Sequence, residues 1–293
     1  MGVRLPLLPM KRRDFLASTL VAAGNLIWSG CGANASSSEP EGLSGEVLKT
    51  ELISRLEAAG AYEVKIADPL RGFAHGIPVR NPRSLFPGCR SVVACLIPNP
   101  AYSAFTDGVP GSTGGGAFLE VDDYPYTHPL VMDFMKDILR TAVGFLGGEG
   151  HRVYSNFGTA RPWPYQIQDK MCAYEAGLGS YGRSGLILHP ELGSRIALFV
   201  LLTDAKMPPD PKAPDSCIGC RRCERDCPGG CFDPTKDYPE SHSVSKCHAT
   251  RERTKRETDQ DCQTCVDTCP VTKHSNEELT AWLEAKARGK TSL

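Results

Sequence analysis

The sequence predicts a mixed α/β domain followed by a small cysteine-rich region. Between residues 45 and 205, segments with helical periodicity alternate with short apolar runs that are typical of strands. Nine of the 13 cysteines lie between residues 217 and 269, seven of them in two regularly spaced runs. A chain of 293 residues, 41% of them hydrophobic, is long enough for one large domain or two modest ones.

The first 35 residues have the features of a twin-arginine (Tat) signal peptide. Arg12 and Arg13 are followed by Phe15 and Leu16, and the apolar run 16–28 is too short to span a membrane. We therefore expect export by the Tat route to the periplasm or to the outer face of the cytoplasmic membrane. That route carries proteins that have already folded. A protein whose metal centre is inserted inside the cell must be exported in this way.

Two processing sites compete in this segment. Ala33 and Ala35 form an A-x-A site for ordinary signal peptidase. The stretch that ends at Cys31 resembles a lipoprotein box, and a lipidated Cys31 would associate the protein with a membrane. Residues 36–45 are rich in Ser and Gly and are expected to form a spacer.

Helices and strands interleave through the predicted α/β domain, residues 46–206. In chain order we expect a helix at 47–59, a strand at 91–97, a helix at 130–146, a strand from 152, a helix at 165–176 and a strand at 195–203. The helical segments repeat apolar residues every three to four positions, whereas the strands are short apolar runs. Gly177 follows the third helix at the C′ position, where glycine commonly ends a helix.

Prolines and a capping motif mark the remaining boundaries. Four prolines between residues 207 and 214 predict a stiff linker to the cysteine-rich region, which we place at 214–274. Ser275 and Glu278 form a capping box for a terminal helix expected at 277–288, within a C-terminal segment at 275–293.

The cysteine spacing is that of bacterial two-cluster ferredoxins. One run reads C-x2-C-x2-C-x3-C and a second C-x2-C-x3-C, each followed by proline, with one cysteine between them. In this pattern the last cysteine of each run binds the other cluster. The expected ligands are Cys217, Cys220, Cys223 and Cys269 for one 4Fe–4S cluster, and Cys227, Cys247, Cys262 and Cys265 for the other.

Other uses of these cysteines explain less of the pattern. Structural zinc closes with four ligands, usually in two separated pairs, so it leaves part of the first run unused. Disulfide frameworks are typical of much shorter secreted chains. Cys231, four residues after Cys227, is either a spare thiol or an alternative ligand.

Residues 177–182 match G-x-G-x-x-G, but they do not indicate a dinucleotide site. That fingerprint needs a strand before the glycines and a helix after them. Here a helix precedes the glycines and a strand-like run follows, so we reject a Rossmann site. The glycines still indicate a tight turn or a backbone close to a ligand.

Residues 176–193, followed by Thr203 and Asp204, resemble the core motif shared by corrinoid reductive dehalogenases and epoxyqueuosine reductases. Residues 86–93 and the double-cluster cysteines resemble other parts of the same family. The resemblance implies a nitroreductase-like α/β (α+β) domain that binds cobalamin, with the two clusters passing electrons to cobalt. The corrinoid is expected against the loop that contains Gly177, Gly179, Gly182 and Gly185.

The chain departs from the reductases at their proton donor. They have an acidic residue between the strand and the helix that precede the glycine motif, whereas residues 155–168 contain no carboxylate. The dehalogenases use a tyrosine, so Tyr165 is the candidate donor here. A phenol, with a usual pKa of ~10, donates a proton more readily when a cation such as Arg183 stabilises the phenolate.

We therefore expect an exported iron–sulfur oxidoreductase that resembles cobalamin-dependent dehalogenases, because an exported protein cannot reach the tRNA on which epoxyqueuosine reductases act in the cytoplasm. The alternative is a ferredoxin-type electron-transfer protein without a corrinoid or a catalytic site. Expected partners are a redox protein or a quinol-linked membrane donor, and a small-molecule substrate if the chain is an enzyme. A formal charge of −1 gives no electrostatic reason to expect nucleic acid.

Overall fold

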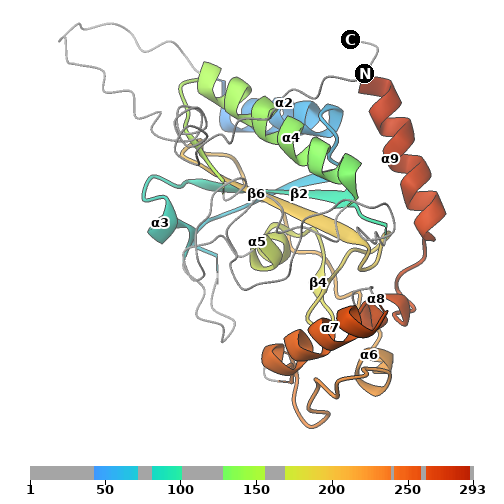
Figure 1. Cartoon of the computed structure of the whole chain (residues 1–293). Coiled ribbons are helices and arrows are strands. Elements are labelled where there is room, and N and C mark those ends of the chain that lie inside the picture. Colours follow the sequence, from blue (N-terminus) through green and yellow to red (C-terminus); the bar gives the residue numbers. More distant parts are fainter. Residues whose placement is uncertain are drawn as a thin grey trace, which may run out of the picture. The chain divides into compact units, whose positions relative to one another are not determined.

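A computed structural model describes residues 43–71, 81–100, 128–155, 169–238, 241–258 and 262–290 of the chain. Residues Gly42–Leu293 form one compact unit (Figure 1). The predicted signal peptide, with Arg12, Arg13 and Cys31, lies outside the described residues, and so does Tyr165.

Four antiparallel strands form the main sheet (Figure 1). In spatial order they are β1 (Glu63–Ala67), β2 (Ser91–Pro98), β6 (Ile196–Thr203) and β3 (Val153–Tyr154). A short helix, α3 (Pro82–Leu85), precedes β2. The eight residues of β2 are all buried, as expected of a strand covered on both faces. The mixed α/β fold predicted from the sequence is confirmed.

One face of this sheet is covered by two helices, α2 (Gly45–Ala58) and α4 (Pro129–Gly148). Leu52 of α2 and Phe134 of α4 are buried in the same apolar core as Cys95 of β2. Since side chains alternate along a strand, the neighbouring residues of β2 point to the opposite face. Both helices lie where the sequence predicted them.

The other face of the sheet packs against α5 (Asp169–Ala176). Its end is a Schellman motif, in which Leu178 N–H donates to Ala173 O at 2.9 Å and Gly177 N–H donates to Tyr174 O at 3.2 Å. Gly177 has a φ of +90°, which favours glycine. The predicted role of Gly177 as the helix terminator is therefore confirmed.

A small two-stranded hairpin follows α5. Its strands are β4 (Ser180–Tyr181) and β5 (Ile187–Leu188), which pair antiparallel. Between them the chain turns tightly, because Gly185 N–H donates to Gly182 O at 2.8 Å. This turn brings the end of the hairpin to the cysteine-rich region.

The cysteine-rich region contains three helices: α6 (Arg222–Arg225), α7 (Val244–Thr258) and α8 (Thr264–Asp267). Among the described apolar side chains of residues 214–274, only that of Cys231 is buried. The hydrophobic effect therefore contributes little to holding this region together.

The proline-rich linker is fixed to the edge of the sheet. Asp210 N–H donates to Ile66 O at 2.8 Å, and Asp210 Oδ2 accepts from Ile66 N–H at 2.7 Å. Lys49 of α2 forms an ion pair with the same carboxylate at 2.7 Å. The linker that leads to the cysteine-rich region is therefore fixed beside β1.

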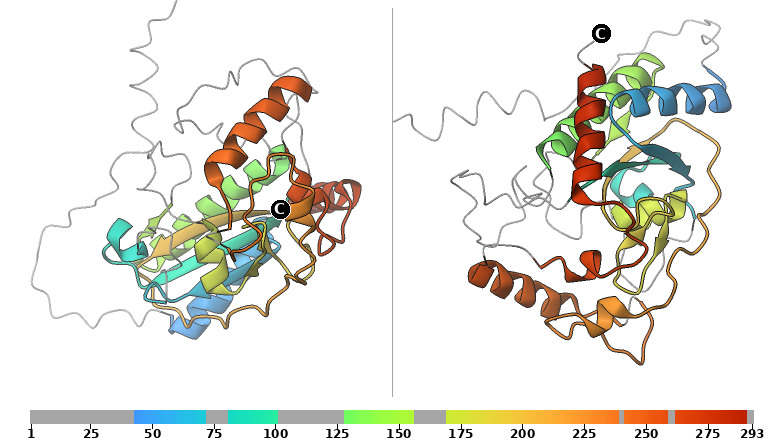
Figure 2. Two further views of the ribbon diagram at one scale, coloured as in Figure 1. Left: turned by 90° about the horizontal axis from the view of Figure 1, so that it is seen from below. Right: turned by 90° about the vertical axis from the view of Figure 1, so that its right-hand side faces the viewer.

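The terminal helix α9 (Asn276–Lys290) packs against α4, as both Figure 1 and the right-hand view of Figure 2 show. Its capping box is confirmed: Ser275 N–H donates to Glu278 Oε2 at 2.8 Å, and Glu278 N–H donates to Ser275 Oγ at 3.2 Å. Leu279 and Leu283 bury their side chains in the two cores of the sheet. Within the described ranges, every helix is too short or too polar to cross a membrane.

Candidate functional site

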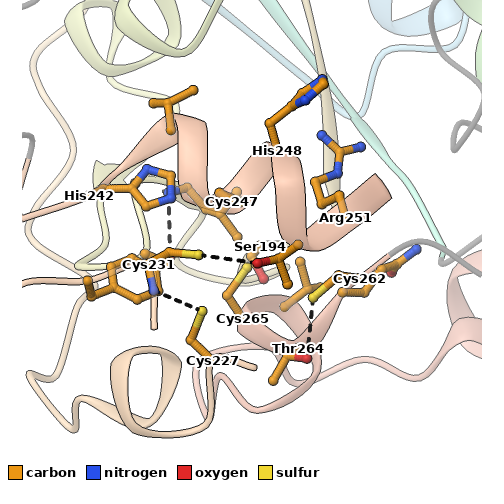
Figure 3. A pocket seen from close by; sticks show the side chains of 18 of the residues that line it. Ser194, Cys227, Cys231, His242, Cys247, His248, Arg251, Cys262, Thr264 and Cys265 are labelled. Carbon is orange, nitrogen blue, oxygen red and sulfur yellow. Dashed lines mark hydrogen bonds between the residues drawn. The ribbon is translucent and has the colours of Figure 1, made fainter. Parts of the chain in front are cut away.

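The eight predicted cluster ligands lie around two cavities. The first cavity is lined by Cys217, Cys220, Cys223 and Cys269. The second, of about 490 Å³ and shown in Figure 3, is lined by Cys227, Cys247, Cys262 and Cys265. Each group is the set that the spacing assigned to one cluster. The structure therefore brings each predicted set together, and ligation itself remains a prediction.

Short helices and left-handed turns aim these cysteines at the cavities. Cys223 lies in α6, Cys247 in α7 and Cys265 in α8. The loop before α6 contains Gly219 and Arg221 with φ values of +68° and +58°. Because such a backbone curls sharply, cysteines three residues apart can face the same cavity.

The turn of the small hairpin lies between the two cavities. Gly182 and Arg183 line the first, Gly185 and Leu186 line the second, and Ser184 lines both. The two cavities are thus neighbours across one turn of backbone, and this turn belongs to the predicted α/β domain. Any centres that occupy them would lie close to each other and to that domain.

The thiols have no competing covalent or chelating arrangement. No disulfide joins the twelve described cysteines. Among the described residues, no three His, Cys, Asp or Glu side chains converge as a single metal ion requires. A four-iron cluster instead takes one thiolate at each iron, so its ligands need not meet at a point. The two sets of four thiols fit that group.

Burial keeps several of these thiols protonated when no metal is bound. Burial, with a contribution from the neighbouring thiols, raises the pKa of Cys265 to about 12 and that of Cys223 to about 11. Metal ligation requires thiolates, so assembly of a cluster must release these protons.

The predicted catalytic cation, Arg183, lines the first cavity. Its guanidinium binds Glu224 through Nε and Asp237 through Nη1, the latter at 2.7 Å, and Nη2 donates to Lys236 O at 3.0 Å. These two carboxylates already balance its charge. Arg183 therefore ties the hairpin to the cysteine-rich region at the first cavity, and its role as a cation that serves a phenol stays a prediction. Tyr165 lies outside the described residues.

The four predicted corrinoid glycines pack against protein atoms. A Cβ on Gly177 would lie 2.1 Å from Pro211 O, and one on Gly179 would lie 2.5 Å from Leu188 O. A Cβ on Gly182 would meet the Leu188 side chain at 2.8 Å. On Gly185 it would meet the Tyr238 ring at 2.4 Å. The glycines are needed for close packing of the chain on itself, so the steric argument for a corrinoid at these positions loses its support.

One carboxylate of interest was missed by the sequence reasoning, which considered only residues 155–168. Asp169 is the first residue of α5, and burial raises its pKa to about 7. The next residue, Lys170, lines the second cavity and donates from Nζ to Gly185 O at 3.1 Å. A carboxyl group that is protonated near neutral pH is able to act as an acid. The sequence placed Asp169 inside a helix expected at 165–176 and could not show the desolvation that raises its pKa.

The fold is the one shared by epoxyqueuosine reductases and reductive dehalogenases. The structure of epoxyqueuosine reductase from Bacillus subtilis matches with a TM-score of 0.55 at 23% identity, over 79% of this chain and 67% of that one. A catabolic reductive dehalogenase matches with a TM-score of 0.52 at 19% identity, over 85% of this chain and 36% of that one. At these identities the likeness shows the fold alone.

Curated relatives point more narrowly to the reductases. An epoxyqueuosine reductase of Bacillus cereus is 26% identical over 217 residues, which cover 68% of this chain and 53% of the relative. The chain thus spans about half the length of that relative. As their name says, these relatives are reductases, that is, oxidoreductases. No family model matches the chain.

The prediction of an exported, dehalogenase-like enzyme is wrong. The curated relatives are named epoxyqueuosine reductase, and one reductase structure contains an epoxyqueuosine-modified tRNA stem loop. The predicted location in the periplasm or at the outer face of the cytoplasmic membrane is contradicted too, because the relatives are named for a nucleoside that one of their structures carries on tRNA. The prediction rested on Arg12 and Arg13 before Phe15, Leu16 and a short apolar run, a local pattern that lies outside the described residues.

Proposed function

We propose that this chain is an iron–sulfur oxidoreductase related to epoxyqueuosine reductases, with two 4Fe–4S clusters that supply electrons for the reduction of a substrate. The observation that carries the proposal is the grouping of eight cysteines into two sets of four on either side of the hairpin turn. Each such cluster exchanges one electron at a time, so an adjacent pair supplies the two electrons that most organic reductions need.

An epoxide on a tRNA nucleoside is the substrate that the relatives' names support. Reduction of an epoxide to an alkene consumes two electrons and two protons and releases the oxygen as water. The electrons would come from the clusters. Asp169, protonated near neutral pH because of its burial, is our candidate for delivering a proton.

The charge of α7 favours a polyanionic partner such as tRNA. This helix has five lysines and arginines against two glutamates, although the whole chain has a formal charge of −1. Of its residues only Thr250 is buried, so most of the helix faces solvent. His248 and Arg251 of α7 line the second cavity, which places this positive helix beside the proposed redox centre (Figure 3). The expectation of no nucleic-acid partner was based on the net charge of the whole chain. That net charge does not show the local excess of positive charge on α7.

Cobalamin binding remains a prediction. Protein atoms occupy the space beside the glycines that were expected to leave room for a macrocycle. No reaction step is therefore assigned to cobalt. The electron donor, a redox protein or a quinol-linked membrane donor, is likewise still a prediction.

The test is anaerobic purification of the whole chain, followed by iron, sulfide, zinc and cobalt analysis and by electron paramagnetic resonance. About eight irons per chain are expected. The reduced protein is then incubated with tRNA that contains epoxyqueuosine, with and without added cobalamin, and the nucleosides are analysed by mass spectrometry. Zinc in place of iron would overturn the cluster proposal. Cluster-loaded protein that leaves the epoxide intact under both conditions would overturn the proposed substrate.

A further inference from the structure

The second cavity contains one thiol more than a 4Fe–4S cluster requires. Cys231 lines it together with Cys227, Cys247, Cys262 and Cys265 (Figure 3). The side chain of Cys231 is only 2% exposed, and it is the one buried apolar residue of the described part of the cysteine-rich region. A cubane cluster takes four protein thiolates, one at each iron. One of these five cysteines is therefore surplus at any moment.

The backbone fixes Cys231 in place beside a predicted ligand. Its N–H lies 3.5 Å from Cys227 Sγ, to which it donates, and its C=O accepts from Ser243 N–H at 2.8 Å. Backbone N–H groups that donate to sulfur are a common feature of iron–sulfur sites. Cys231 is thus held at the sulfur side of Cys227, where a cluster would lie.

Two glycines make this placement possible. Gly230 has a φ of +54° and donates from N–H to Cys227 O at 3.2 Å, which closes a tight turn between the two cysteines. A Cβ on Gly229 would lie 2.0 Å from Thr250 Oγ1, so only glycine lets the turn approach α7 this closely. Because of this turn, Cys231 reaches the same cavity as Cys227 although only four residues separate them.

Cys247 is the predicted ligand that Cys231 is best placed to replace. Both thiols line the second cavity, and Cys231 Sγ lies 4.0 Å from Thr250 Oγ1, about one helical turn along α7 from Cys247. Cys247 is partly exposed on a helix whose only buried residue is Thr250. The other three ligands come from the two regular cysteine runs, whereas Cys247 comes from outside both.

We propose that Cys231 is a second, interchangeable ligand for the same iron of the second cluster, so that this iron binds either Cys247 or Cys231. The proposal rests on the proposed clusters and adds a ligand that the regular spacing does not assign. In the exchange, the Fe–S bond to Cys247 breaks and an Fe–S bond to Cys231 forms. The proton leaves Cys231 Sγ and is taken up by Cys247 Sγ, and no electron is transferred.

The test is iron analysis of cysteine variants after anaerobic reconstitution with iron and sulfide. Wild type, Cys247→Ala and Cys231→Ala should each bind about eight irons per chain, whereas the double variant should bind about four. The paramagnetic spectrum of Cys247→Ala should differ from that of wild type in the signal of one cluster only, because a different thiolate then binds one iron.

Matched controls make the result specific. Cys95→Ala removes a buried thiol of β2 far from the cavities in sequence, and combined with Cys247→Ala it should leave about eight irons. In every variant, an unchanged paramagnetic signal from the first cluster shows that the chain has folded. Loss of about four irons in either single variant would overturn the proposal, since neither cysteine could then replace the other. Wild-type protein without iron would instead overturn the proposed function.

Discussion

Cys269 lies in the same short cysteine run as Cys265, yet the two line different cavities. Pro270 follows Cys269, and the chain leaves this position away from the second cavity. If the cavities hold clusters, neighbours in the sequence bind different metal centres. The crossed arrangement therefore predicts which pairs of cysteine substitutions remove the same cluster and which pairs remove both clusters.

Double substitutions should separate the two clusters. Cys269→Ala combined with Cys217→Ala should lose no more iron than either single variant, about four atoms, because both cysteines serve one cluster. Cys269→Ala combined with Cys262→Ala should lose about eight, because each serves a different one. Iron analysis after anaerobic reconstitution measures both. The reverse pattern would show that the ligands are not crossed.

Asp169 should make stability depend on pH. Burial raises its pKa to about 7 in the folded chain, above the value of ~3.9 expected when unfolded. Between these values the folded state holds the proton more tightly, so stability falls as the pH rises from about 4 to 7. In Asp169→Asn no carboxyl group ionises at this position, so this loss of stability does not occur. At pH 8 the melting temperature of the variant should therefore exceed that of wild type, by roughly 2–4 °C for each kcal/mol of unfolding free energy regained.

Calorimetry under anaerobic conditions at pH 5 and pH 8 gives the comparison. The difference between Asp169→Asn and wild type should grow with pH. Asp133→Asn, at a side chain that is 63% exposed on α4, should show no such trend. An equal effect of Asp169→Asn at both pH values would mean that the carboxyl group is ionised throughout.

Residues differ in how far the sequence reveals their role. The cysteine runs are local patterns, so two sets of four could be assigned from spacing alone. Arg183 binds Glu224 and Asp237, which lie 41 and 54 residues away, so its charge balance could not be read from its neighbours. The glycines were recognised as sites of close approach, but the sequence could not show that the approaching group is protein.

Elements were predicted well where burial leaves a periodic signal. β2 and β6 are apolar runs because both faces of the sheet are covered, and α4 carries an apolar stripe on one side. β1 was missed because it is short and contains both Glu63 and Lys65, whose ion pair lies at the sheet edge. α7 was missed because it is polar on nearly every side and therefore has no 3.6-residue pattern.

The end of α5 should be sensitive to a single methyl group. In Gly177→Ala, the left-handed backbone costs about 1–2 kcal/mol, and the new Cβ would lie 2.1 Å from Pro211 O. Because Pro211 belongs to the linker, the loss of stability should exceed that backbone cost. Urea unfolding of the purified chain measures it.

Gly144→Ala is the matched control. Gly144 lies within α4, and a Cβ there meets no atom within 4 Å. Alanine in a helix interior is more favourable than glycine by up to about 1 kcal/mol, so this variant should be more stable than wild type. Equal effects of the two substitutions would mean that neither the φ of Gly177 nor its contact with the linker matters.

At the scale of the molecule, the two parts of the chain differ in what stabilises them. The sheet buries apolar side chains on both faces, whereas the cysteine-rich region buries only Cys231 among its described apolar residues. In a region that buries few apolar side chains, the free energy of metal binding adds directly to the stability of the folded state. The proposed clusters would therefore be structural as well as redox-active.

Removal of iron should loosen one part of the chain and spare the other. After chelation under reducing conditions, backbone amides of α6, α7 and α8 should exchange with deuterium at least tenfold faster. Amides of β2 and β6 should keep their protection, because their apolar core contains no predicted ligand. Hydrogen exchange read by mass spectrometry distinguishes the regions. Uniform loss of protection across both would contradict this division.

The low burial of apolar side chains in the described part of the cysteine-rich region also has a consequence for the living cell. If the proposed clusters form, a newly made chain would complete its sheet without iron, but its cysteine-rich part would stay accessible to proteases until the clusters are inserted. The amount of intact protein would then follow the iron supply without any change in transcription. Iron starvation would remove the enzyme by shortening its lifetime.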